Sequence, residues 1–148
     1  MTPEAILERS LSEMQGKLFE LSGKRGYDSA NFIRLFMTSS IVAGLDSKFD
    51  FMQWAGKEYI LEKMEDDYAG RLTKSGRVYD GEVLYWIGYV YRRWHYKTGE
   101  SGSEILKQAD PEIMNIMYLG YHTLDVGMAI ERLKAAPSQP EQFSQWDG

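Results

Sequence analysis

The sequence has no cysteine, so disulfide bonds and thiolate metal sites are excluded and an intracellular setting is expected. Its first residues, MTPEAILERSLSEMQ, lack the basic and apolar regions of a signal peptide. No uninterrupted apolar stretch approaches the roughly 20 residues that a helix needs to cross a bilayer. We therefore expect a cytoplasmic protein that does not contact the membrane.

A segregated basic surface is also missing. The net charge is −5, and lysine and arginine do not gather in any one segment. An acidic chain without such a surface repels the phosphate backbone, so a nucleic-acid partner is not expected. The charge instead favours a partner that is neutral or basic.

Metal-binding and catalytic motifs are scarce. The two histidines, His95 and His122, do not have a spacing typical of metal ligands. Glu58, Glu62 and Asp66 recur every four residues, which is the pattern of a solvated helix face. The serines of the segment GESGSE fit a helix cap better than a nucleophile. The sequence therefore predicts no cofactor, metal or catalytic residue, and it favours a protein that is not an enzyme.

Apolar residues recur with a helical period along almost the whole chain. The sequence predicts an all-α fold, with six or seven helices in a single compact bundle at 1–136 and a flexible tail at 137–148. One helix is expected over 28–44 and the next over 48–67. The second of these is expected to turn five residues inward, namely Phe49, Met52, Tyr59, Ile60 and Met64.

The helix predicted over 80–97 contains about a third of the chain's aromatic residues and is expected to lie at the centre of the bundle. At about 100° per residue, one side, which should face the core, carries Val83, Ile87, Val90 and Trp94. The opposite side carries Glu82, Tyr85, Tyr89, Arg92 and Tyr96. Tyrosine and arginine are enriched where proteins concentrate binding energy, so this side is a candidate partner-binding face.

Other interpretations of this helix stay open from the sequence. A central helix can be buried on all sides, with its tyrosines hydrogen-bonded inside the domain. The same side chains can line a small-molecule pocket. The segment 101–122 can also be drawn as a helix-turn-helix, but it lacks the basic residues that a recognition helix carries near its start.

The stretches YWIGYVYRRWHYKTGESGSEI (85–105) and YLGYHTLDVGMAIERL (118–133) resemble a group of small helical bacterial proteins. These proteins are presumed antitoxins of toxin–antitoxin pairs, and in some pairs the toxin resembles an ADP-ribosyltransferase. The resemblance spans residues 80–133 and is clearest in the aromatic helix and in GYHTLD at 120–125. It implies a role, the sequestration of a cognate toxin, and it assigns no individual residue.

The leading prediction is an antitoxin-like protein without catalytic activity that binds and neutralises a partner protein. The first alternative is a small helical enzyme or ligand-binding domain whose pocket is formed by Arg92, His95, Tyr96 and His122. The second alternative is a DNA-binding regulator. The first predicted helix, which follows Pro3, has a narrow, mostly leucine seam that leaves a homodimer open; the seam is formed by Leu7, Leu11, Met14, Leu18 and Leu21. The predicted partner-binding residues are Tyr85, Tyr89, Arg92 and Tyr96, with Phe143 and Trp146 in the tail as secondary contacts.

Overall fold

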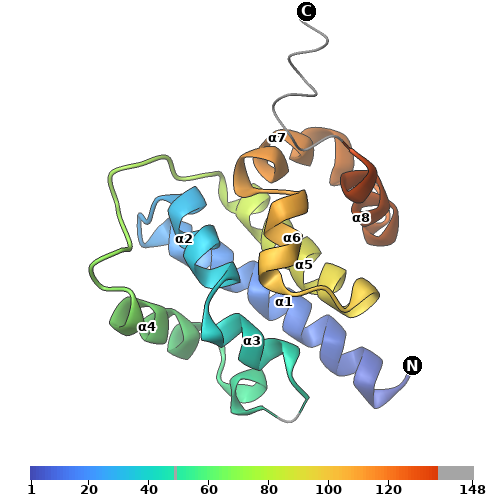
Figure 1. The fold of residues 1–148 in the computed structure, drawn as a ribbon, viewed down its shortest axis with the longest axis horizontal. Coiled ribbons are helices and arrows are strands. Elements are labelled where there is room, and N and C mark those ends of the chain that lie inside the picture. Colours follow the sequence, from blue (N-terminus) through green and yellow to red (C-terminus); the bar gives the residue numbers. More distant parts are fainter. Residues whose placement is uncertain (49, 137–148) are drawn as a thin grey trace, which may run out of the picture.

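Helix α5 is the central element of the structure, and α1 packs along it more extensively than any other helix does (Figure 1). The computed structural model describes residues 1–48 and 50–136. These residues contain helices and no strand, which confirms the all-α prediction. The elements are α1 (Pro3–Lys24), α2 (Ser29–Met37), α3 (Ser40–Asp46), the 3-10 helix η1 (Phe51–Trp54), α4 (Lys57–Asp67), α5 (Gly81–Thr98), α6 (Gly102–Gln108), α7 (Pro111–Tyr121) and α8 (Val126–Ala135).

The prediction of one helix over 28–44 is wrong, because the helix is interrupted at Ser39 and continues as a second helix. The backbone of Ser39 is extended, and its Oγ accepts a hydrogen bond from the Val42 N–H at 3.3 Å. The same hydroxyl donates to the Phe36 carbonyl at 2.6 Å. Ser39 therefore begins α3 and also satisfies a carbonyl at the end of α2, which makes two short helices more favourable than one long helix.

The predicted helix over 48–67 begins later than expected, at Lys57. Gly56, with φ at +81°, lies in the left-handed region that favours glycine, and η1 precedes it. Ile60 is buried as predicted, but Tyr59 is 45% exposed, so its predicted inward position is wrong. Phe49 lies outside the described residues.

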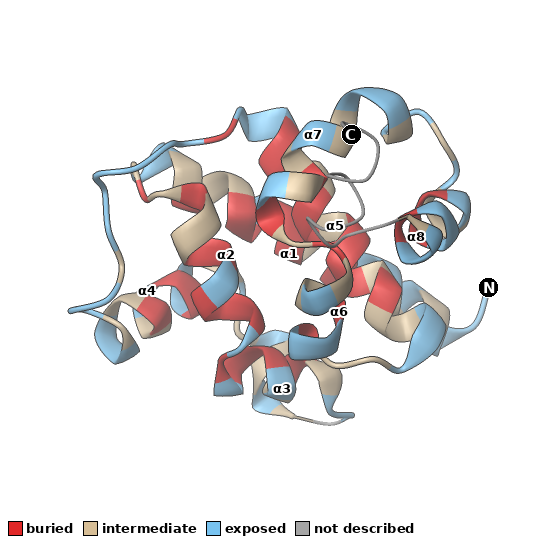
Figure 2. Cartoon of the chain, turned by 45° about the horizontal axis from the view of Figure 1, so that its top comes forward, coloured by how far each residue is buried: buried red, intermediate tan, exposed pale blue. Residues whose placement is uncertain are grey.

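The core forms where α1, α2 and α5 meet, and the outward sides of α7 and α8 remain exposed (Figure 2). At its centre, Phe19 of α1 makes edge-on ring contacts with Phe32 and Phe36 of α2 and with Tyr91 of α5, at centroid distances of 5.9, 5.5 and 6.4 Å. Helices α7 and α8 also contact α5. No helix in the described part of the chain has both the length and the hydropathy needed to cross a membrane.

Two glycines allow α1 and α5 to approach closely. A Cβ atom on Gly88 would lie 2.5 Å from the Gln15 carbonyl oxygen, and a Cβ atom on Gly16 would lie 2.8 Å from the Tyr85 ring. The Gln15 side chain crosses the same interface, where its Nε2 donates to the Gly88 carbonyl at 2.9 Å. The crossing therefore depends on the absence of side chains at both glycines.

We expect Gly88→Ala to lower the free energy of unfolding by about 1 to 3 kcal/mol, because the added methyl group meets backbone rather than a movable side chain. Gly120→Ala is the matched control, since a Cβ there meets nothing within 4 Å and the residue lies in the exposed last turn of α7. The control should leave stability unchanged or raise it by up to about 1 kcal/mol. Urea unfolding of both variants measures the difference. Equal effects at the two positions would contradict the close crossing.

Glu100, just beyond α5, joins α5, α6 and α8. Its carboxylate accepts hydrogen bonds from Trp94 Nε1 at 2.9 Å, Gln108 Nε2 at 2.6 Å and Lys134 Nζ at 2.5 Å. Burial alone would raise the pKa of Glu100, but hydrogen bonds from Lys134, Trp94 and Gln108 outweigh it and lower the pKa to about 2.

This lowered pKa predicts a pH dependence of stability. The ionised Glu100 stabilises the fold above its ordinary pKa of 4.5, and that stabilisation is lost as the pH falls from there through about 2. Because Glu100 is partly solvated, we expect Glu100→Gln to cost only about 1 to 2 kcal/mol at neutral pH. Urea unfolding across the acid range should show a smaller pH dependence in the variant than in the wild type. If the free energy of unfolding depends on pH equally in the variant and the wild type, Glu100 does not cause the acid dependence.

Candidate binding site

Arg92 is buried inside the fold, with only 1% of its surface exposed. Its Nε donates to Gln15 Oε1 at 2.9 Å, and its Nη1 donates to Asp46 Oδ1 at 2.7 Å. The guanidinium carbon lies 5.5 Å from the centre of the Tyr96 ring. The prediction that Arg92 lies on an accessible face is therefore wrong: α1 and α3 supply polar partners that compensate its burial.

Tyr96 belongs to the same inward cluster. Its ring is half-buried, and its hydroxyl is buried without a hydrogen-bond partner among the described residues. Burial raises the pKa of Tyr96, while the nearby charge of Arg92 opposes the rise. Tyr96 therefore offers less accessible surface to a partner than predicted.

Tyr85 and Tyr89 lie at a surface groove, and Arg92 and Tyr96 do not. Both are half-buried, and their rings stack with 6.2 Å between centroids and 18° between planes. Tyr85 lies over Gly16 of α1, where the missing side chain leaves room for its ring. Burial, with smaller contributions from Glu13, Tyr89 and Glu20, raises the pKa of Tyr85. The predicted face is thus divided: Glu82, Tyr85 and Tyr89 line a surface groove, whereas Arg92 and Tyr96 do not line it.

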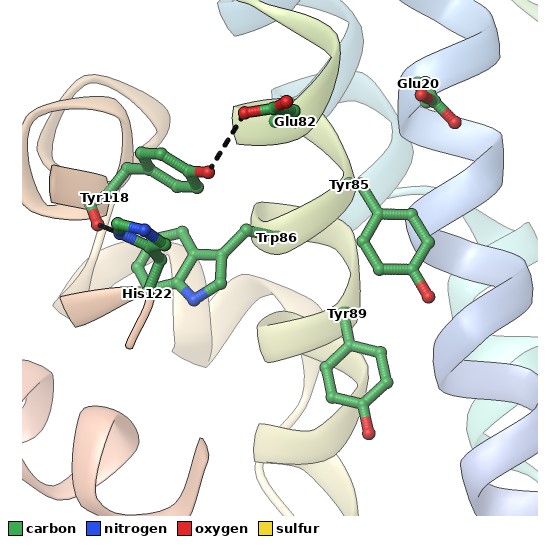
Figure 3. A pocket seen from close by; sticks show the side chains of 7 residues that line it. All are labelled: Glu20, Glu82, Tyr85, Trp86, Tyr89, Tyr118 and His122. Atoms are coloured by element: carbon green, nitrogen blue, oxygen red, sulfur yellow. Dashed lines mark hydrogen bonds between the residues drawn. The ribbon is translucent and has the colours of Figure 1, made fainter. Parts of the chain in front are cut away.

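The groove has a volume of about 370 Å³ and lies over α5, between α1 and α7 (Figure 3). Trp86 projects from α5 toward the end of α7, while Tyr85 and Tyr89 project from α5 on the side of α1 (Figure 3). The lining residues are Glu20, Glu82, Tyr85, Trp86, Tyr89, Tyr118 and His122.

A network of ring contacts fixes the α7 side of the groove. Trp86 and Tyr118 meet edge to face, with centroids 5.8 Å apart. His122 stacks on Tyr118 at 4.3 Å, and its Nδ1 donates to the Tyr118 carbonyl at 2.7 Å. These rings are therefore positioned before any ligand arrives, which reduces the entropy cost of binding. The four-residue spacing of Tyr118 and His122 is visible in the sequence, but their contact with Trp86 is not.

The charge of the groove is negative. Glu82 accepts a hydrogen bond from the Tyr118 hydroxyl at 3.5 Å, and burial followed by the charge of Glu82 raises the pKa of Tyr118. Glu20 approaches from α1: a Cβ on Gly81, the residue before Glu82, would lie 3.4 Å from Glu20 Oε2. Within the described part of the chain, no lysine or arginine lines the groove. This arrangement disfavours anionic ligands and favours neutral or cationic ones.

The alternative pocket of Arg92, His95, Tyr96 and His122 is not formed. The groove that contains His122 includes none of the other three residues. His95 lies elsewhere on α5, with its Nδ1 2.8 Å from the carbonyl oxygen of Glu100 and its ring against Tyr96. Among residues 1–48 and 50–136, no three histidine, aspartate or glutamate side chains come together as metal ligands.

Two further predictions concern other parts of the chain. Phe143 and Trp146 lie outside the described residues. The segment 101–122 forms α6 and α7, as a helix-turn-helix would require, but the exposed residues of α7 include Glu112, Ile116 and Leu119 and no base-reading arginine or lysine.

Comparison with known proteins adds no relative. No protein-family model matches the chain, and no curated protein or solved structure matches it significantly.

Proposed function

We propose that this chain is a cytoplasmic, non-enzymatic antitoxin-like protein that binds a partner protein, its cognate toxin, and neutralises it through the groove over α5. The observation that carries the proposal is the gathering of four large aromatic side chains, Tyr85, Trp86, Tyr89 and Tyr118, at one surface groove. Aromatic side chains held in place by their neighbours are typical anchors of protein–protein interfaces.

The exposed side of α7 can extend this contact surface. Leu119 is 82% exposed and Ile116 is 70% exposed, on the helix that also supplies Tyr118 and positions His122. A stable interface needs about 800 Å² on each partner, which is more than the groove alone provides. Leu119 directly follows Tyr118 in the chain, and exposed apolar surface of this kind can add to the area of an interface.

Co-expression with the product of the neighbouring gene tests the proposed function. The wild-type chain should restore growth to cells that express this product, and the two proteins should purify as one complex. Tyr89→Ala should weaken both effects while the variant remains folded. Tyr59→Ala is the matched control, since it removes a half-exposed tyrosine from α4. Failure to rescue growth, or rescue without a complex, would count against neutralisation by binding.

A further inference from the structure

The groove combines aromatic faces with carboxylates, and the described residues that line it include no lysine or arginine. Aromatic rings carry negative charge on their faces and attract cations that lie over them. Glu20 of α1 and Glu82, about one turn before Tyr85 on α5, both line the groove, and their carboxylates make it negative (Figure 3). Ring faces and carboxylates thus favour the same class of ligand, an organic cation.

The shape of the site distinguishes a side chain from a free small molecule. The groove is an open surface feature, and its rings do not close into a cage around a ligand. The centroids of Tyr85 and Tyr89 are 6.2 Å apart, too close for a cation to fit between the rings. These two tyrosines instead present an outer surface on which a flat group can stack. An open groove of this kind suits a side chain that projects from a macromolecule.

A guanidinium group fits this arrangement better than an ammonium group does. It is planar, it stacks on aromatic faces, and its N–H groups pair with carboxylates in the plane of the stack. An ammonium group is compact and more strongly hydrated, so it loses more on leaving water. The chain's own segment 137–148, PSQPEQFSQWDG, contains neither arginine nor lysine and cannot supply the cation.

We propose that the groove binds an arginine side chain of the partner protein, with the guanidinium group stacked on the Tyr85–Tyr89 surface and paired with Glu20 and Glu82. This inference rests on the proposed function, in which the groove is the surface that contacts the partner.

NMR titration of the free, full-length protein with Nα-acetylarginine amide tests the inference. The indole N–H signal of Trp86, assigned through Trp86→Phe, and the backbone amides of α5 should shift and saturate. Nα-acetylcitrulline amide is the neutral isostere, and at matched ionic strength it should bind about tenfold more weakly. Equal responses to arginine and citrulline would overturn the inference, and so would stronger binding of choline than of arginine.

Charge variants locate the site. The double variant Glu20→Gln/Glu82→Gln should lose the preference for arginine over citrulline. The control Glu58→Gln/Glu62→Gln makes the same change in net charge on exposed residues of α4 and should keep the preference. Equal behaviour of the two double variants would overturn the inference.

Binding and neutralisation assays with the partner show whether this inference or the proposed function fails. If Glu20→Gln/Glu82→Gln still binds and neutralises the partner with wild-type affinity, the arginine assignment is wrong and the function stands. If the free protein selects arginine through these carboxylates but the wild type neither binds nor neutralises the partner, the proposed function is wrong and the cation site stands, without a partner to supply the arginine.

Discussion

Replacing Arg92 with methionine is expected to lower the free energy of unfolding by about 3 to 5 kcal/mol, the largest effect of any substitution considered for this protein. The loss has two causes. Gln15 Oε1 and Asp46 Oδ1 both lose their donor, and the Asp46 side chain, only 17% exposed, keeps only the His95 ring nearby, with its Nδ1 at 3.7 Å from Oδ1. Chemical denaturation measures the loss directly.

Arg93→Met is the matched control for this prediction. Arg93 is half-buried and makes no ion pair with any residue in 1–48 or 50–136. Its replacement should change stability by about 0.5 kcal/mol or less. A double variant, Arg92→Met/Asp46→Leu, should recover part of the loss, because it removes both charges together. If Arg92→Met is as stable as Arg93→Met, the buried network contributes nothing to the fold.

Replacing Tyr89 with alanine is expected to weaken partner binding by about 2 kcal/mol or more, roughly a thirtyfold increase in Kd. Tyr89 lines the groove and stacks on Tyr85, so its removal takes away both a contact and the support of a second one. The fold should change little, because the ring is half-buried at the surface. Calorimetric titration with the partner gives the change in Kd. A loss of equal size in Tyr59→Ala would show a general effect rather than an anchor at the groove.

These two predictions give different roles to two residues that the helical pattern placed on one face of α5: Arg92 stabilises the fold, and Tyr89 binds the partner. A helical period gives the angle of each side chain around α5, and it grouped Arg92 with Tyr85 and Tyr89. It does not tell which neighbouring helix covers that side. Helix α1 was expected to contact its neighbours through a narrow leucine seam, yet Ser12, Gln15 and Ser22 are buried as well.

Local signals were more reliable than long-range ones. The capping residue Ser101 begins a helix where the sequence predicts it, because a cap acts on the backbone within three residues. The helix boundaries at Ser39 and Gly56 also have local causes. Serine and glycine also occur inside helices, so their presence alone did not predict these boundaries. The groove could not be predicted, since Trp86 meets Tyr118 only through the packing of α7 on α5.

Cross-saturation NMR of the labelled protein bound to its unlabelled partner tests the central claim most directly, since it identifies the residues in contact. Among the described residues, aromatic side chains are accessible at the groove over α5 and also at η1 and α4, where Phe51, Trp54 and Tyr59 are exposed and the rings of Phe51 and Tyr59 are in contact. We predict that saturation transfers to Tyr85, Trp86, Tyr89 and Tyr118 and to the exposed side of α7. Transfer confined to Phe51, Trp54 and Tyr59 would contradict the account.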